Sequence, residues 1–116
     1  MSDLLTQELK ATILIVDDIS LTRRQLLDIL IENGFQVIQA ESGAEALELA
    51  VASQPQLILL DIVMPDMDGF QACRELKANP SLKDIPVIFI SSLDETSSKV
   101  KGFDAGGVGC VGHDFW

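Results

Sequence analysis

The chain has 116 residues, of which 47% are hydrophobic and 22% are charged, with 18 acidic against 8 basic residues and a formal net charge of −10. This length and composition are typical of one globular domain, and the acidic excess excludes nucleic acid as a natural partner while favouring cations wherever carboxylates converge. No apolar stretch approaches the ~20 residues of a membrane span, and the first ten residues lack the pattern of a signal peptide. We therefore expect a cytoplasmic protein without a membrane partner.

The chain begins with a polar, mixed stretch, and we expect residues 1–11 to be a lead-in to a single domain over residues 12–116. The β-branched run 12–16 predicts a first strand that ends at Asp17-Asp18. Ser20 is a plausible N-cap for the helix that follows, and Gly34 ends that helix. Helical spacing places these residues inside: Leu26, Leu27, Leu30 and Ile31. It places these outside: Arg23, Arg24, Asp28 and Glu32.

The middle of the chain repeats the alternation of strand and helix. Residues 36–40 predict a second strand, and Ser42 with Glu45 matches a capping box at the start of a second helix. The buried stripe of that helix is expected to contain Ala46, Leu47, Ala50 and Val51. The uninterrupted apolar run 57–60 then predicts a strand that is covered on both faces and ends at Asp61.

After a turn-rich loop that ends at Gly69, the rest of the chain continues the alternation of helix and strand. Phe70, Cys73 and Leu76 have helical spacing, and Asn79-Pro80 breaks that third helix. Residues 86–90 predict a fourth strand, a weaker helix follows around Val100 and Phe103, and residues 108–111 predict a brief fifth strand. Alternation at this spacing predicts an α/β fold with a parallel sheet. The two cysteines, Cys73 and Cys110, are too far apart to suggest a metal cage or a disulfide framework.

Polar groups end three of these strands, at Asp17-Asp18, at Asp61 and at Ser91. If the first and third strands are adjacent, these groups meet at one edge of the sheet, where carboxylates in contact need a cation to remain ionised. Oxygen ligands at a solvent-facing edge favour Mg²⁺, and a carboxylate oxygen beside such an ion can attack phosphorus to give an aspartyl phosphate. Taken singly, the acidic pair could instead interact with a helix dipole, and Ser91 could be an ordinary strand-end hydroxyl.

The chain resembles a response-regulator receiver domain of two-component signalling, similar to the chemotaxis receivers. The resemblance rests on the acidic pair Asp17-Asp18, on the loop D-x-x-M-P-x-M-D-G from Asp61 to Gly69, and on Ser91. It implies a doubly wound, parallel, five-stranded sheet with the flavodoxin-like order 2-1-3-4-5.

The resemblance also implies a role for each matching residue. Asp61 would accept a phosphoryl group from the phosphohistidine of a histidine kinase or phosphotransfer protein. Asp18 and Asp61 would bind Mg²⁺ directly, Val63 would contribute its backbone carbonyl, and Asp17 would act through water. Ser91 would take the place of the switch hydroxyl that closes on the phosphate. Such a module is not classed as an enzyme, although receivers catalyse their own phosphorylation.

The C-terminal part departs from the family pattern. The position of the family's lysine holds His113, which either replaces the lysine when protonated or is a surface tail residue. The position of the switch aromatic holds Cys110, which cannot act as a ring toggle. The sequence departs from the family pattern from about residue 106, and we expect no fifth helix after the fifth strand. The apolar surface left by its absence is expected to promote self-association.

The leading hypothesis is a single-domain response regulator that signals through a downstream protein target. The alternative is a receiver-like interaction or dimerisation module that works without phosphorylation, its switch disconnected. The hypothesis of a Mg²⁺-dependent phosphatase has less support, because no second acidic residue follows Asp61 in a D-x-D motif and the sequence offers no substrate cap. A flavin carrier is weaker still, because no phosphate-binding loop follows the first strand.

Overall fold

The computed structural model describes residues 11–91 and 109–112. Its elements, in chain order, are β1 (Thr12–Val16), α2 (Ser20–Glu32), β2 (Gln36–Ala40), α3 (Gly43–Ser53), β3 (Leu57–Asp61), α4 (Gly69–Ala78), β4 (Val87–Ser91) and β5 (Gly109–Gly112). Among these described helices, none has the length and apolar character needed to cross a membrane.

The five strands form one parallel sheet in the order β2-β1-β3-β4-β5, which confirms the predicted order. Val16, the last residue of β1, pairs with Ala40 on one side and with Leu60 on the other. Asp61 pairs with Ile90 of β4. The carboxyl ends of these strands therefore lie in register along a single edge of the sheet.

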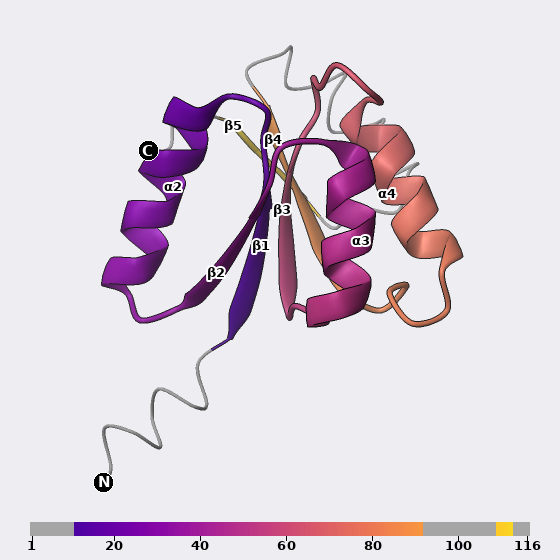
Figure 1. The fold of residues 1–116 in the computed structure, drawn as a ribbon, viewed down its shortest axis with the longest axis horizontal. Coiled ribbons are helices and arrows are strands. Elements are labelled where there is room, and N and C mark those ends of the chain that lie inside the picture. Colours follow the sequence, from indigo (N-terminus) through magenta and orange to yellow (C-terminus); the bar gives the residue numbers. More distant parts are fainter. Residues whose placement is uncertain (1–10, 92–108, 113–116) are drawn as a thin grey trace, which may run out of the picture.

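Helices cover the two faces of the sheet unequally within the described residues. Helix α2 lies on one face, and α3 and α4 lie side by side on the other (Figure 1). Strand β1 contributes to both layers because its side chains alternate: Leu14 and Val16 join the core under α3 and α4, while Ile13 and Ile15 pack with Leu26 of α2. This two-sided burial is the reason that the central strands β1 and β3 are nearly continuous apolar runs.

The start of α2 differs from the prediction. Ser20 is not the N-cap, because the helix begins at Ser20 and the capping position is Ile19, without a side-chain cap. The N–H of Ile19 instead donates to Oδ1 of Asp17 at 2.9 Å, so the preceding carboxylate organises this turn. Gly34 does follow the end of the helix, with the positive φ of 87° that favours glycine. Ile31, expected inside, is 56% exposed.

The start of α3 agrees with the prediction in part. Ser42 is the N-cap, and its Oγ accepts a hydrogen bond from the N–H of Glu45 at 3.1 Å. The carboxylate of Glu45, however, accepts from the N–H of Glu41 at 2.8 Å, one residue before the position that a capping box requires. Val51, placed in the buried stripe by the sequence, is 50% exposed, so the stripe is narrower than predicted.

The remaining expectations about the fold concern other parts of the chain. The lead-in over residues 1–10, the helix around Val100 and Phe103, and the segment that follows Gly112 lie outside the described residues.

Candidate metal centre

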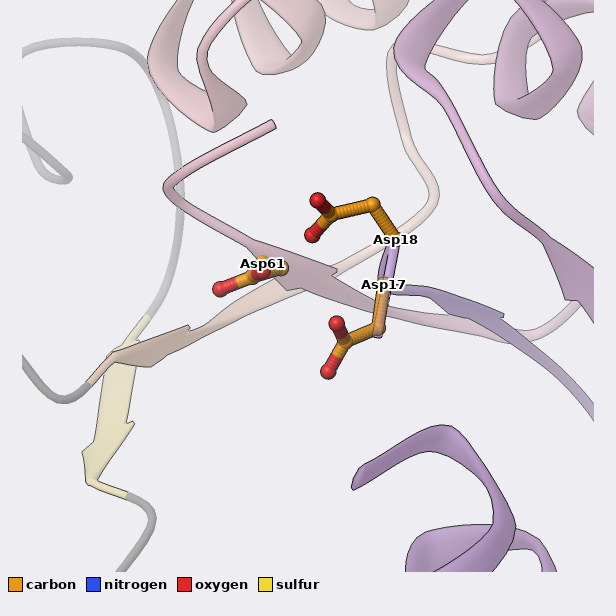
Figure 2. Close-up of side chains that lie close together, drawn as sticks. All are labelled: Asp17, Asp18 and Asp61. Carbon is orange, nitrogen blue, oxygen red and sulfur yellow. The ribbon is translucent and has the colours of Figure 1, made fainter. Parts of the chain in front are cut away.

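Three carboxylates gather at the carboxyl edge of the sheet, as the sequence predicts. Asp17 and Asp18 follow β1, and Asp61 ends the neighbouring β3 (Figure 2). A ligand oxygen from each of the three lies within 4.8 Å of the other two. Asp17 and Asp61 are buried and Asp18 is exposed, so the cluster has a dry side and a side open to solvent.

Close packing at the end of β3 positions Asp61. Its Oδ1 accepts a hydrogen bond from the N–H of Ile62 at 2.9 Å, which fixes the orientation of the carboxylate. The N–H of Gly69 donates to the carbonyl of Ile62 at 2.7 Å, so the start of α4 is drawn against the strand. A Cβ at Gly69 would collide with the carbonyl oxygen of Asp61, so this close approach of the two backbones requires glycine.

Main-chain hydrogen bonds position Asp17. Its N–H donates to the carbonyl of Ala40 at 3.1 Å, which continues the pairing of β1 with β2 by one residue. Its side chain is then directed to the strand edge, where Oδ1 accepts from Ile19. Asp18 is the next residue, so the same backbone segment delivers both carboxylates.

The electrostatics of the cluster disfavour three ionised groups. Burial, followed by repulsion from Asp17 and, to a smaller extent, from Asp18, raises the pKa of Asp61 to about 7, although the hydrogen bond from Ile62 acts in the opposite direction. A divalent cation would replace this repulsion by attraction. Three carboxylates with one solvent-facing side fit a hard ion such as Mg²⁺, which prefers oxygen ligands and retains waters.

The other predicted site residues are placed only in part. Val63 lies two residues beyond Asp61, with its side chain 59% exposed, and the role of its carbonyl stays a prediction. Ser91 is the last residue of β4, one position beyond Ile90, which pairs with Asp61. The backbone of Ser91 is thus at the edge that holds the carboxylates, while its side chain lies outside the described part of the structure.

The structure describes the two unusual C-terminal positions only in part. Cys110 lies in β5, where it pairs with Phe89, and its side chain is outside the described part. His113 lies outside the described residues altogether. The suggested roles of both residues stay predictions.

Sequence reasoning missed Asp66, which anchors the loop between β3 and α4. Its two carboxylate oxygens accept hydrogen bonds from the N–H groups of Gly43 and Ala44, at 3.1 and 3.0 Å, at the start of α3. These bonds, the one from Ala44 above all, lower the pKa of Asp66. The loop that carries Val63 is thereby tied to a helix more than twenty residues earlier in the chain, and the sequence contains no local signal for this contact.

Arg23 was also missed, because the prediction that it faces solvent is wrong: its side chain is only 11% exposed. A signal for this burial was present. Arg23 precedes Leu26, Leu27 and Leu30 by three, four and seven residues, which places it on the same helix face as the buried stripe.

Comparison with known proteins gives the family to which this fold belongs. The chain matches the family of response regulator receiver domains over residues 13–115. It is 41% identical over 92 residues to protein PilH of Pseudomonas aeruginosa, an alignment that covers 79% of this chain and 76% of PilH. The chain belongs to the response regulator receiver domain family.

Other relatives include larger proteins. Response regulator PleD of Caulobacter vibrioides is 41% identical over 98 residues, which are 84% of this chain and 22% of PleD, so the chain spans about a fifth of that relative.

Solved structures agree on the fold. A response regulator described as putative from Chloroflexus aurantiacus has a TM-score of 0.85 at 30% identity, covering 89% of this chain and 84% of that one. Chemotaxis protein CheY4 of Vibrio cholerae has a TM-score of 0.83 at 27% identity, covering 88% and 85%.

Proposed function

We propose that this protein is a phosphorylation-dependent response regulator in which Asp61 accepts a phosphoryl group in a Mg²⁺-dependent reaction. The donor is the phosphohistidine of a histidine kinase or phosphotransfer protein, and the output is binding to a downstream protein. One observation carries the proposal: three carboxylates from β3 and from the turn after β1 lie within 4.8 Å of one another at one strand edge. Membership of the receiver family and the likeness to PilH and CheY4 support it.

Asp18 and Asp61 would hold the Mg²⁺ ion, together with the carbonyl of Val63, and Asp17 would act through water. When bound, the ion supplies positive charge that stabilises both the ionised carboxylates and the transferred phosphoryl group. Asp61 then acts as the nucleophile. One of its carboxylate oxygens forms a bond to phosphorus while the bond from phosphorus to the imidazole nitrogen breaks, and that nitrogen keeps the electron pair.

The surrounding chain supports this role of Asp61. The N–H of Ile62 holds Oδ1 at 2.9 Å, so the carboxylate is oriented before a donor arrives. Ser91, at the end of β4, is proposed to hydrogen-bond the phosphoryl group, and His113 to replace the family's lysine when it is protonated. Cys110 stands where the family has its switch aromatic, so the conformational output of this protein would not use a ring.

The direct test is phosphorylation of Asp61. Wild-type protein incubated with acetyl phosphate and Mg²⁺ is expected to gain the mass of one phosphoryl group, and Asp61→Asn is expected to gain none. Chelation of Mg²⁺ should abolish the gain in the wild type. A wild type that stays unmodified under conditions that phosphorylate a related receiver would contradict the proposal.

Partner affinity measured before and after phosphorylation of Asp61 separates the alternative function. A phosphorylation-independent interaction module is favoured by the presence of Cys110 at the switch position, and it predicts that partner affinity is unchanged by phosphorylation. Self-association stays a prediction that rests on residues outside the described part, and sedimentation at micromolar concentration tests it. A cytoplasmic location also stays a prediction.

A further inference from the structure

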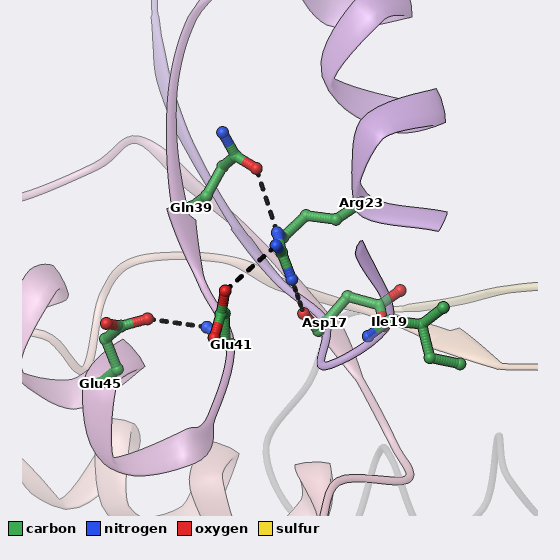
Figure 3. Close-up of polar contacts among 6 residues, drawn as sticks. All are labelled: Asp17, Ile19, Arg23, Gln39, Glu41 and Glu45. Carbon is green, nitrogen blue, oxygen red and sulfur yellow. Dashed lines mark hydrogen bonds and ion pairs between the residues drawn. The ribbon is translucent and has the colours of Figure 1, made fainter. Parts of the chain in front are cut away.

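The positively charged side chain of Arg23 is buried beside the acidic cluster, and it is not one of the proposed metal ligands. The guanidinium of Arg23, on α2, donates three hydrogen bonds: to the carbonyl of Asp17 at 2.7 Å, to Oε1 of Gln39 at 3.0 Å, and to Oε1 of Glu41 at 3.3 Å (Figure 3). Gln39 belongs to β2 and Glu41 follows that strand, so one side chain joins α2, the end of β2 and the turn after β1.

The hydrogen bond to Asp17 is made to its main chain. The acceptor is the carbonyl oxygen of the peptide that links Asp17 to Asp18, which is the peptide that sets the direction of both carboxylates. On the other side of Asp17, its Oδ1 accepts from the N–H of Ile19. The turn is therefore held at a backbone atom and at a side-chain atom, and none of the three acceptors of Arg23 is a carboxylate oxygen of the acidic cluster.

The arrangement of the three acceptors around the Arg23 guanidinium requires arginine. Three acceptors on two segments, the turn after β1 and the end of β2, are reached by the Nε, Nη1 and Nη2 atoms of one planar group. A lysine ammonium is a single point on a flexible stem and cannot reproduce such a planar arrangement. Because lysine keeps the positive charge but not the planar group, the substitution Arg23→Lys separates the effect of the charge from that of the side-chain geometry.

We propose that Arg23 is a positioning residue for the metal centre: it clamps the peptide between Asp17 and Asp18 so that their carboxylates face Asp61 at cation-binding distance. This inference rests on the proposed function of the acidic cluster. Its consequence is that substitution of Arg23 weakens Mg²⁺ binding although every proposed ligand remains.

The test compares Arg23→Lys and Arg23→Met with Arg24→Met, which removes the same charge from the exposed neighbouring position. We expect both Arg23 variants to weaken Mg²⁺ binding, measured by calorimetry at about pH 8, by about tenfold or more, as outer-shell partners of metal ligands do. Arg24→Met should stay within about twofold of wild type, because Arg24 is exposed.

A second readout is local. Hydrogen exchange of the Ile19 amide, which donates to Asp17, should accelerate in Arg23→Lys while amides in α4 keep their wild-type exchange rates. Full Mg²⁺ affinity in Arg23→Lys would overturn the inference, because charge alone would then be sufficient. Should Arg23→Met not fold, the lysine variant decides. If the wild type takes up no Mg²⁺, the proposed function fails and the inference with it, whereas normal wild-type uptake with unchanged variants overturns only the inference.

Discussion

At the scale of single residues, Asp61 is the clearest example of function set against stability. It is 6% exposed and faces two other carboxylates, and its pKa is raised to about 7. A metal-free protein therefore carries an unfavourable charge at the position that the proposed chemistry requires. Such a conflict is typical of functional sites and is relieved when a cation binds.

This conflict predicts an unusual dependence of stability on pH. Because the folded protein holds the Asp61 proton that the unfolded chain has already lost, the contribution of Asp61 to the free energy of unfolding decreases as pH rises from about 4 to about 7 and is constant above. Without metal at about pH 8, Asp61→Asn should be more stable than wild type by on the order of 1–3 kcal/mol. Urea unfolding in a chelator between about pH 5 and 8 measures this. A variant that tracks the wild type at every pH would contradict it.

Arg23 illustrates at the same scale what the sequence conceals. Its helical spacing agrees with burial, but a charged side chain is buried only where partners satisfy it. Those partners, Gln39 and Glu41, are sixteen and eighteen residues away and approach only once β2 pairs with β1. The acidic cluster was predictable because the carboxyl ends of adjacent parallel strands lie at one edge of the sheet. The contacts of Arg23 were not predictable, because they form only when α2 packs against the end of β2.

At the scale of elements, strands were easier to predict than helix ends. The bounds of β1, β2 and β3 agree with the predicted runs, and the central strands β1 and β3 were the clearest because strands buried on both faces are nearly uninterrupted apolar segments. Strand β4 begins one residue later than predicted, at Val87, because Pro86 has no N–H to donate to a neighbouring strand, although its carbonyl accepts from Ile58. The N-cap at Ser42 was recognisable from its partner Glu45.

The anchor between the loop after β3 and the start of α3 can be tested by Asp66→Ala. We expect a loss of about 1 kcal/mol in the free energy of unfolding near pH 7, because two N–H groups at a helix start lose their charged acceptor. The pKa of Asp66 is lowered, so its stabilising effect is present above the unfolded value of 3.8 and disappears as pH falls through the lower folded value. The difference between variant and wild type should therefore shrink in acid.

The matched control for this loop variant is Asp28→Ala, which removes a carboxylate from the exposed face of α2. It should change the free energy of unfolding by less than about 0.5 kcal/mol. Equal effects of the two substitutions would show that general charge, and not the contact with α3, accounts for the loss.

At the scale of the whole molecule, the net charge of −10 and the carboxylates at the shared strand edge favour cations, and the proposed binding of Mg²⁺ would be linked to protons. Below its raised pKa, Asp61 must release a proton before it can bind Mg²⁺. We expect Mg²⁺ affinity to fall as pH decreases from about 8 to about 6, approaching about tenfold per unit at the lower end. Calorimetry in two buffers with different ionisation enthalpies measures the released proton. Affinity that is constant over this range would contradict the prediction.

The strand order has a consequence for how the chain acquires its shape during synthesis. Strand β1 occupies a place between β2 and β3, so a nascent chain that has emerged only as far as Ala40 can complete one side of β1 and leaves the other open. The open edge of β1 remains unpaired until Leu57 has been made, because Leu57 is the partner of Ile13 and follows it by more than forty positions. Pairing between such distant residues slows folding, and an unpaired strand edge can pair with other chains. The strand that precedes the acidic pair is thus paired on both sides only after β3 has formed, and β3 in turn lacks its second neighbour until β4 has been made.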